Sequence, residues 1–177
     1  MELVNTSIIP PEFRNSVNTF LSFLNPEATV LVIGAGDTDL LNKFKFNGFH
    51  VICIEQDPEL CRKWRLQGVD MIQGTFKDLA TIKAPNNLQG IWGGSAFEHM
   101  PLDQFEHNLE IIHLMLPNHG AFFLRVLKGE EVTTTDQTHF YSENELQRTL
   151  RDIHFDIKLL ESSTPSTLTA VATRESN

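Results

Sequence analysis

The chain has 177 residues, the length of one domain rather than two. Hydrophobic residues make up 41% and charged residues 21%, as in ordinary globular domains that fold without disulfides or metal. The formal net charge is −9, and such an acidic surface repels phosphate backbones and anionic membranes. We therefore expect a single domain, 1–177, that binds neither nucleic acid nor a membrane.

The cysteines and the first residues indicate the compartment. Cys53 and Cys61 are the only cysteines, and two do not make a disulfide framework. The opening stretch MELVNTSIIPPEFRN has no basic segment followed by an apolar one, so we expect no secretory signal. No apolar run approaches the roughly 18 residues that span a bilayer. These features predict a reduced, cytoplasmic protein.

Short apolar runs alternate with segments of helical periodicity. A first helix is expected within 1–27, where apolar residues recur at helical spacing after Pro10 and Pro11. Seven runs are predicted as strands: 28–33, 50–54, 69–72, 90–96, 121–127, 155–160 and 168–173. This alternation is typical of an α/β fold, a Rossmann-like three-layer sandwich with helices on both faces of a parallel sheet.

The end of the chain departs from the parallel pattern. About seven residues, among them Pro165, join the last two predicted strands. Because a helical crossover needs more residues, this final pair is expected to be antiparallel. Before it, the polar, threonine-rich segment 128–141 is predicted as a loop and is a candidate active-site loop.

The most informative stretch is VLVIGAGDTDLL, a buried strand that runs into Gly34-Ala35-Gly36 and then a helix. Glycines in such a turn allow a tight bend and let a ligand approach the backbone. Nineteen residues after Gly36, Glu55 ends the second predicted strand, where a carboxylate can accept hydrogen bonds from both ribose hydroxyls. The pair predicts an adenosine-containing cofactor, with a dinucleotide, S-adenosylmethionine (SAM) or no ligand as the alternatives.

Charges beside the turn distinguish these alternatives. The dinucleotide fingerprint needs a third glycine where the chain has Asp39, and Asp37 adds a second carboxylate that would oppose a pyrophosphate. SAM carries a sulfonium and an ammonium, and an ion pair at about 4 Å contributes up to ~4 kcal/mol before desolvation. The residues therefore favour SAM over NAD. The alternative without a ligand stays open: Asp37 would then only cap the helix, and Glu55 would be a solvated acid at the end of its strand.

Five stretches, in order, resemble the class I SAM-dependent methyltransferases: VLVIGAGDT, VICIEQD, QGIWGGSAFEHMP, LPNHGAFFL, and HFYSENEL followed by HFDIKLLE. The resemblance spans nearly the whole chain. It implies a sheet of order 3-2-1-4-5-7-6 with the last strand antiparallel. It also implies methyl transfer from SAM to a nucleophile, with S-adenosylhomocysteine (SAH) as the product.

The family pattern also implies cofactor-binding residues at the ends of the first four strands. The glycine turn should hold the methionine part, the second and third strand ends the ribose and adenine, and the fourth the sulfonium. The residues are Gly34, Ala35, Gly36, Asp37, Glu55, Gln56, Thr75, Phe76, Gly93, Gly94 and Ser95.

The sequence departs from the family at three places. Val32 stands where the family often has an acid, Thr38 replaces the third glycine of the turn, and the P-G-G turn is 117–120 with sequence PNHG. Val32 and Thr38 motivate a second hypothesis, a SAM-binding protein of this fold that is catalytically inactive and acts through a partner. A third, an NAD-linked oxidoreductase, is disfavoured by Asp39 and by the antiparallel closing pair.

Methyl transfer from a sulfonium depends mainly on aligning donor and acceptor, so no single catalytic residue is fixed. His99, which titrates near neutral pH, and Tyr141, at the end of the 128–141 segment, are the candidates. Arg125 lies within an apolar strand and needs a partner, for which an internal acid is favoured over a substrate carboxylate. The scattered histidines show no metal-ligand spacing, so no metal is expected.

The acceptor is expected to be a small molecule. Insertions between the predicted elements are short, and the chain has no basic patch for a nucleic acid. Oxygen, nitrogen and sulfur acceptors all stay open, as does the oligomeric state. Phe13 and Phe20 could cap the cofactor pocket, although their spacing is more typical of core packing.

Overall fold

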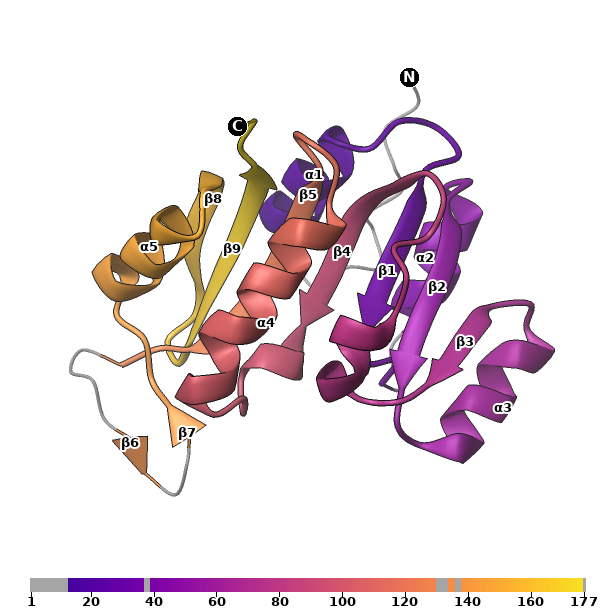
Figure 1. Ribbon diagram of the computed structural model, residues 1–177, viewed down its shortest axis with the longest axis horizontal. Coiled ribbons are helices and arrows are strands. Elements are labelled where there is room, and N and C mark those ends of the chain that lie inside the picture. The colour runs from indigo at the N-terminus through magenta and orange to yellow at the C-terminus, as the bar shows by residue number, and fades with distance from the viewer. Residues whose placement is uncertain (1–12, 37–38, 130–133, 136–137, 177) are drawn as a thin grey trace.

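The computed structural model describes residues 13–36, 39–129, 134–135 and 138–176 (Figure 1). Its main feature is a seven-stranded sheet of order β3-β2-β1-β4-β5-β9-β8. The strands are β1 Thr29–Ile33, β2 His50–Glu55, β3 Asp70–Gln73, β4 Leu88–Gly94, β5 Ala121–Leu127, β8 Phe155–Thr164 and β9 Thr167–Arg174.

The sheet is parallel except at β9. Strands β1 to β5 pair in parallel, whereas β9 runs antiparallel to both β5 and β8. Counted along the chain, the seven strands have the order 3-2-1-4-5-7-6, with the last strand antiparallel. The fold class expected from the sequence is therefore confirmed.

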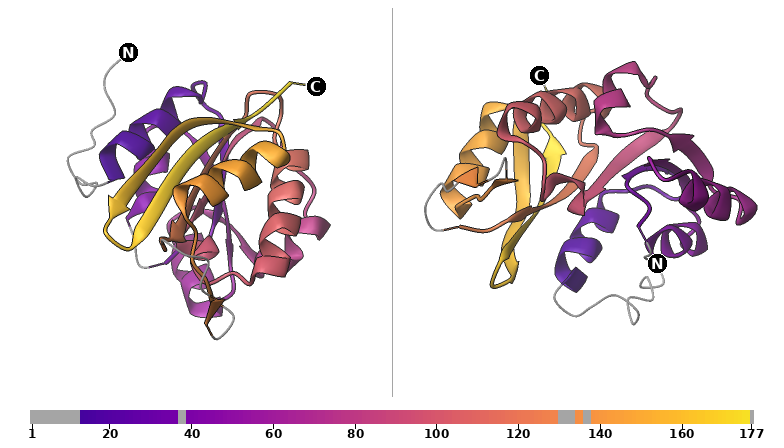
Figure 2. Two further views of the ribbon diagram at one scale, coloured as in Figure 1. Left: turned by 90° about the vertical axis from the view of Figure 1, so that its left-hand side faces the viewer. Right: turned by 90° about the horizontal axis from the view of Figure 1, so that it is seen from below.

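Helices cover both faces of the sheet (Figure 2). On one face lie α1, α2 and α3, whose buried residues form one core cluster, and on the other lie α4, α5 and the 3-10 helix η2, which form a second. The bounds are α1 Arg14–Ser22, α2 Leu40–Phe46, α3 Pro58–Leu66, η2 Phe76–Thr81, η3 Ser95–Phe97, α4 Leu102–Met115 and α5 Glu143–Asp152.

The buried central strand aligns the edge at which a ligand can bind. All five residues of β1 are buried, because helices cover both of its faces. The strand pairs with β2 without a register shift, from Thr29 opposite His50 to Ile33 opposite Ile54. The carboxyl ends of β1 and β2 therefore lie side by side, which brings the glycine turn next to Glu55.

Helix α1 packs closely on the sheet through an aromatic cluster. The ring of Phe20 is fully buried and meets Trp92 edge-on, with 5.3 Å between the ring centroids. Gly90 makes this approach possible, because a Cβ there would lie 2.7 Å from the Phe20 ring. Phe20 is thus a core residue, as its spacing favoured.

Three segments differ from the sequence-based expectation. The fourth strand, expected over 90–96, is β4 Leu88–Gly94, and residues 95–96 belong to η3. The last two strands are longer than expected, and only Pro165 and Ser166 separate them. The segment 128–141, expected as a loop, contains the short antiparallel strands β6 Thr134–Thr135 and β7 Thr138–His139. The β-branched threonines, interpreted as loop residues, also suit strands, which explains the difference.

Candidate functional site

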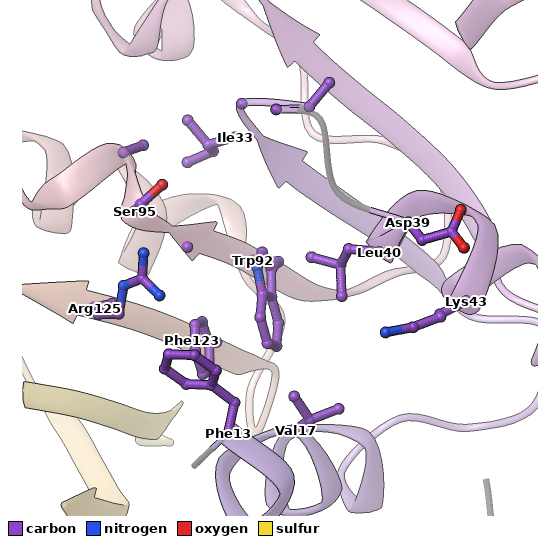
Figure 3. A pocket seen from close by; sticks show the side chains of 15 residues that line it. Phe13, Val17, Ile33, Asp39, Leu40, Lys43, Trp92, Ser95, Phe123 and Arg125 are labelled. Atoms are coloured by element: carbon purple, nitrogen blue, oxygen red, sulfur yellow. The ribbon is translucent and has the colours of Figure 1, made fainter. Parts of the chain in front are cut away.

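A cavity of about 320 Å³ lies at the carboxyl ends of β1 and β4, on the face covered by α1 and α2 (Figure 3). Ligands of open α/β sheets bind at this edge. Its lining comes from α1, the glycine turn, α2, β4, η3 and β5. The lining residues are Phe13, Val17, Ile33, Gly34, Ala35, Gly36, Asp39, Leu40, Lys43, Trp92, Gly94, Ser95, Ala96, Phe123 and Arg125.

The glycine turn leaves room above its backbone. Gly34 has φ +84° and Gly36 has φ +54°, a left-handed conformation that glycine adopts without strain. A Cβ built on Gly34 would meet no atom within 4 Å, so the space beside this backbone is open. The turn can therefore admit a ligand close to the main chain.

Glu55 joins the glycine turn to the start of α3. Its side chain is buried, with 8% exposure, and each carboxylate oxygen accepts one backbone hydrogen bond. Oε2 accepts from the Ala35 N–H at 2.8 Å, and Oε1 accepts from the Asp57 N–H at 2.9 Å. An ionised carboxylate offers about four acceptor positions, so these two backbone groups leave two of them unused. Glu55 is therefore not the solvated acid that the sequence left open. Glu55 lies next to the cavity through Ala35 and is not among the residues that line it.

The neighbouring glycines of β4 have different environments. Gly94, with φ +51°, and Ser95 line the cavity together with the glycine turn. Gly93 does not line it, because the space of its missing side chain is filled by Phe97. A Cβ on Gly93 would lie 2.6 Å from the Phe97 ring.

The three residues expected near the adenine lie away from this cavity. Gln56 is exposed beside Glu55. Thr75 caps η2: its Oγ1 accepts from the Lys77 N–H at 3.2 Å, and its own N–H donates to Asp78 at 2.8 Å. Phe76 follows it and packs against the core on the α4 face. Asp37 lies outside the described residues.

The two catalytic candidates are separated from the cavity. His99 is exposed between η3 and α4. Tyr141 is 1% exposed and lies on the α4 face of the sheet, opposite the cavity. The centroid of its ring is 4.7 Å from that of Phe105 and 4.4 Å from that of His139. Burial raises the pKa of its phenol. His139 is itself buried, with Nε2 2.8 Å from Oε1 of Glu145, so this group anchors the end of segment 128–141 to α5. A catalytic role for His99 or Tyr141 stays a prediction.

An aromatic wall of the cavity was missed by the sequence analysis. The rings of Trp92 and Phe123 stack with 3.5 Å between centroids and 3° between planes, and both line the cavity. Each lies in an apolar run that indicates a buried strand. The available signal was the period of two along a strand, which puts Trp92 on the side of Gly94 and Phe123 on the side of Arg125.

Arg125 has the internal acid that its buried position favoured. Its Nε donates to Oε1 of Glu98, and the two side chains are 28% and 14% exposed. The guanidinium also lies 5.1 Å from the centroid of the Phe13 ring, within range of a cation–π interaction. The ion pair fixes one side of the guanidinium, and Figure 3 shows the group at the cavity.

Within the described residues, no group of three or more histidine, cysteine, aspartate or glutamate side chains is placed to hold a metal ion. No helix in that part of the chain has the length and apolarity needed to cross a membrane.

Comparison with known proteins establishes the fold. No family model and no curated protein matches the sequence. The 1,6-didemethyltoxoflavin-N1-methyltransferase of Burkholderia thailandensis, solved with 1,6-didemethyltoxoflavin and SAH, is 20% identical with a TM-score of 0.76 over 97% of this chain and 82% of that chain.

Two more solved structures agree. A putative sarcosine dimethylglycine methyltransferase of Galdieria sulphuraria is 13% identical, with a TM-score of 0.74 over 93% of this chain and 84% of that chain. A putative methyltransferase of Haloferax volcanii, in complex with the Trm112 activator, is 17% identical, with a TM-score of 0.72 over 93% of this chain and 91% of that chain. The chain has the fold of the class I SAM-dependent methyltransferases, and at these identities the likeness establishes the fold alone.

Proposed function

We propose that the protein binds SAM beside the glycine turn and transfers its methyl group to a small-molecule nucleophile. The position of Glu55 carries the proposal. Its carboxylate is fixed by two backbone amides next to the open turn, and each oxygen keeps one acceptor position for a ribose hydroxyl. The fold of the Burkholderia thailandensis enzyme, which was solved with SAH and a small molecule, supports the same reading.

The residues of the site fit this cofactor. Gly34, Ala35 and Gly36 would hold the methionine part against the backbone, and Glu55 would hold the ribose. Bound SAM supplies an electrophilic methyl group on its sulfonium. The cavity would align the acceptor with that methyl group, since orientation supplies several kcal/mol of such a barrier. An acceptor that loses its proton late needs no base from the protein.

The charge beside the turn favours SAM over NAD. The side chain of Asp39 forms no cap with the helix backbone, and its Oδ1 accepts from Nδ2 of Asn42 at 3.0 Å. Its carboxylate remains at the cavity, where it would attract an ammonium group and repel a pyrophosphate. This argument opposes the oxidoreductase hypothesis.

The cavity also bears on the inactive alternative. Its volume of about 320 Å³ is at the lower end for ligand pockets, and no described side chain plugs the open space at Gly34. This volume supports a small acceptor. An open site fits a SAM-binding protein with or without catalysis, so methyl transfer to an acceptor, and not SAM binding, separates the proposed function from the inactive alternative.

Titration calorimetry tests the proposal directly. We expect SAM and SAH to bind the protein and NAD not to bind. Glu55→Gln should weaken SAH binding by about 1–3 kcal/mol, measured at a temperature at which the variant is folded. Glu59→Gln, an exposed acid four residues later, is the matched control and should bind SAH normally. Binding of NAD without SAM would overturn the proposal. If SAM binds, SAH formation with a panel of acceptors identifies the substrate.

A further inference from the structure

Three residues bring unused hydrogen-bond donors to the cavity. Among the described residues, Arg125 donates only through its Nε, to Glu98, so both of its η nitrogens are left. Within the described part of the chain, neither the indole N–H of Trp92 nor the hydroxyl of Ser95 has a hydrogen-bond partner, and all three residues line the cavity. Figure 3 shows the guanidinium, the indole nitrogen and Ser95 at the same end.

The guanidinium is held in a fixed orientation. The largely buried carboxylate of Glu98 accepts a hydrogen bond from Nε of Arg125. The guanidinium carbon of Arg125 lies 5.1 Å from the centroid of the Phe13 ring. A guanidinium fixed in this way presents a planar fork of donors, which matches the two oxygens of a carboxylate. The remaining donors from Trp92 and Ser95 add to the same preference for a negatively charged, oxygen-containing group.

The rest of this end of the cavity is apolar. The rings of Trp92, Phe123 and Phe13 border it. A ligand that satisfies both parts has an aromatic or other apolar body and one acidic group. On the basis of the methyl-transfer function proposed above, we infer that Arg125 selects a methyl acceptor that carries a carboxylate on an apolar, ring-sized body.

Two observations assign this carboxylate to the acceptor rather than to the cofactor. The sheet order places β5 two strands from β1, and at about 4.8 Å per strand Arg125 is on a strand ~10 Å from the one that leads into the glycine turn, where the methionine part would lie. Asp39 and Lys43 line the opposite end of the cavity, beside the glycine turn (Figure 3). The carboxylate of Asp39 complements the ammonium of the methionine part, which would place that part at the end of the cavity away from Arg125.

The test compares matched acids and neutral amides on the wild-type protein saturated with SAH. The pairs are benzoate and benzamide, phenylacetate and phenylacetamide, and 1-naphthoate and 1-naphthamide, titrated by calorimetry. We expect at least one acid to bind ten times or more tightly than its amide. Equal binding within every pair, or no binding by any acid, would overturn the inference.

Variants then locate the charge. Arg125→Gln should abolish the preference for the acid, and Arg125→Lys should keep part of it, since lysine retains the charge without the fork. Arg62→Gln, which removes an exposed arginine outside the cavity, is the control and should keep the full preference. The double variant Glu98→Gln, Arg125→Gln removes both charges of the ion pair and serves if the single variant fails to fold.

The affinity for SAH separates the two possible sources of the carboxylate. Arg125→Gln should leave SAH binding within twofold of wild type. A loss of SAH affinity as large as the loss of acid affinity would assign Arg125 to the cofactor and overturn the inference. If wild-type protein bound no SAH, the proposed methyl transfer would fail instead, and the acid and amide pairs would still be compared on the protein alone.

Discussion

Replacement of Glu55 by glutamine tests whether one carboxylate holds the turn and α3 together. Both carboxylate oxygens accept backbone N–H groups, from Ala35 and from Asp57. Glutamine offers one carbonyl oxygen and one NH₂ group. Whichever way its amide is oriented, the NH₂ group faces one of the two backbone donors.

The structure sets the size of the effect. One hydrogen bond to a charged acceptor is lost, at about 1.5–3 kcal/mol, and the other becomes a weaker bond to a neutral acceptor. We expect the free energy of unfolding to fall by about 2–4 kcal/mol. For a chain of this length each kcal/mol lowers Tm by roughly 2–4 °C, so the midpoint should fall by roughly 4–16 °C.

Urea unfolding followed by circular dichroism measures this change through the midpoint at an unchanged m-value. The control is Glu59→Gln, whose side chain is 77% exposed and, among the residues that the structure describes, pairs only with the exposed Arg62. The free energy of unfolding of this control should stay within about 0.5 kcal/mol of wild type. If Glu55→Gln were as stable as this control, the two backbone contacts would not stabilise the fold and our account of the turn would be wrong.

Three further predictions concern packing and pH. Gly93→Ala should lower the free energy of unfolding by about 1–3 kcal/mol, because its Cβ would lie 2.6 Å from the Phe97 ring; an unchanged urea midpoint would mean that the ring can shift freely. Phe20→Ala should lower the free energy of unfolding by about 3–5 kcal/mol, whereas Phe46→Ala, at a position that is 88% exposed, should lower it by less than about 0.5 kcal/mol. Similar urea midpoints for the two variants would contradict the packing of α1 on the sheet. Burial raises the pKa of the Cys53 thiol. Above about pH 9 the unfolded chain therefore loses this proton while the folded chain keeps it, and the free energy of unfolding falls by up to ~1.4 kcal/mol per pH unit. Cys53→Ala should remove that component of the pH slope, and an unchanged slope would refute it.

The sheet could be predicted from local patterns because its central strands are buried on both faces. The run 28–33 indicated a central parallel strand, and the short connection near Pro165 indicated the antiparallel pair. The lengths of the last strands could not be predicted, since their ends are polar and are set by pairing between β8 and β9. The threonines of β6 and β7 were ambiguous because threonine is polar enough for a loop and its branched side chain also suits a strand.

The site divides in a similar way. Gly34 and Glu55 could be found from spacing, because a turn and an acid at neighbouring strand ends meet wherever the strands pair in register. Gly93 and Gly94 could not be told apart, because their roles depend on which side of the strand each faces. Trp92 and Phe123 read as core residues: the period of two placed them on the side of Gly94 and Arg125, but it did not distinguish a cavity wall from buried packing.

The position of Trp92 gives the protein a built-in optical reporter. The chain has two tryptophans, and Trp64 is enclosed by the core beneath α3, whereas Trp92 borders the cavity. Emission from an indole responds to the polarity of its surroundings. Ligand entry should therefore alter the fluorescence of the unlabelled protein, so libraries of candidate acceptors can be screened before any product is known.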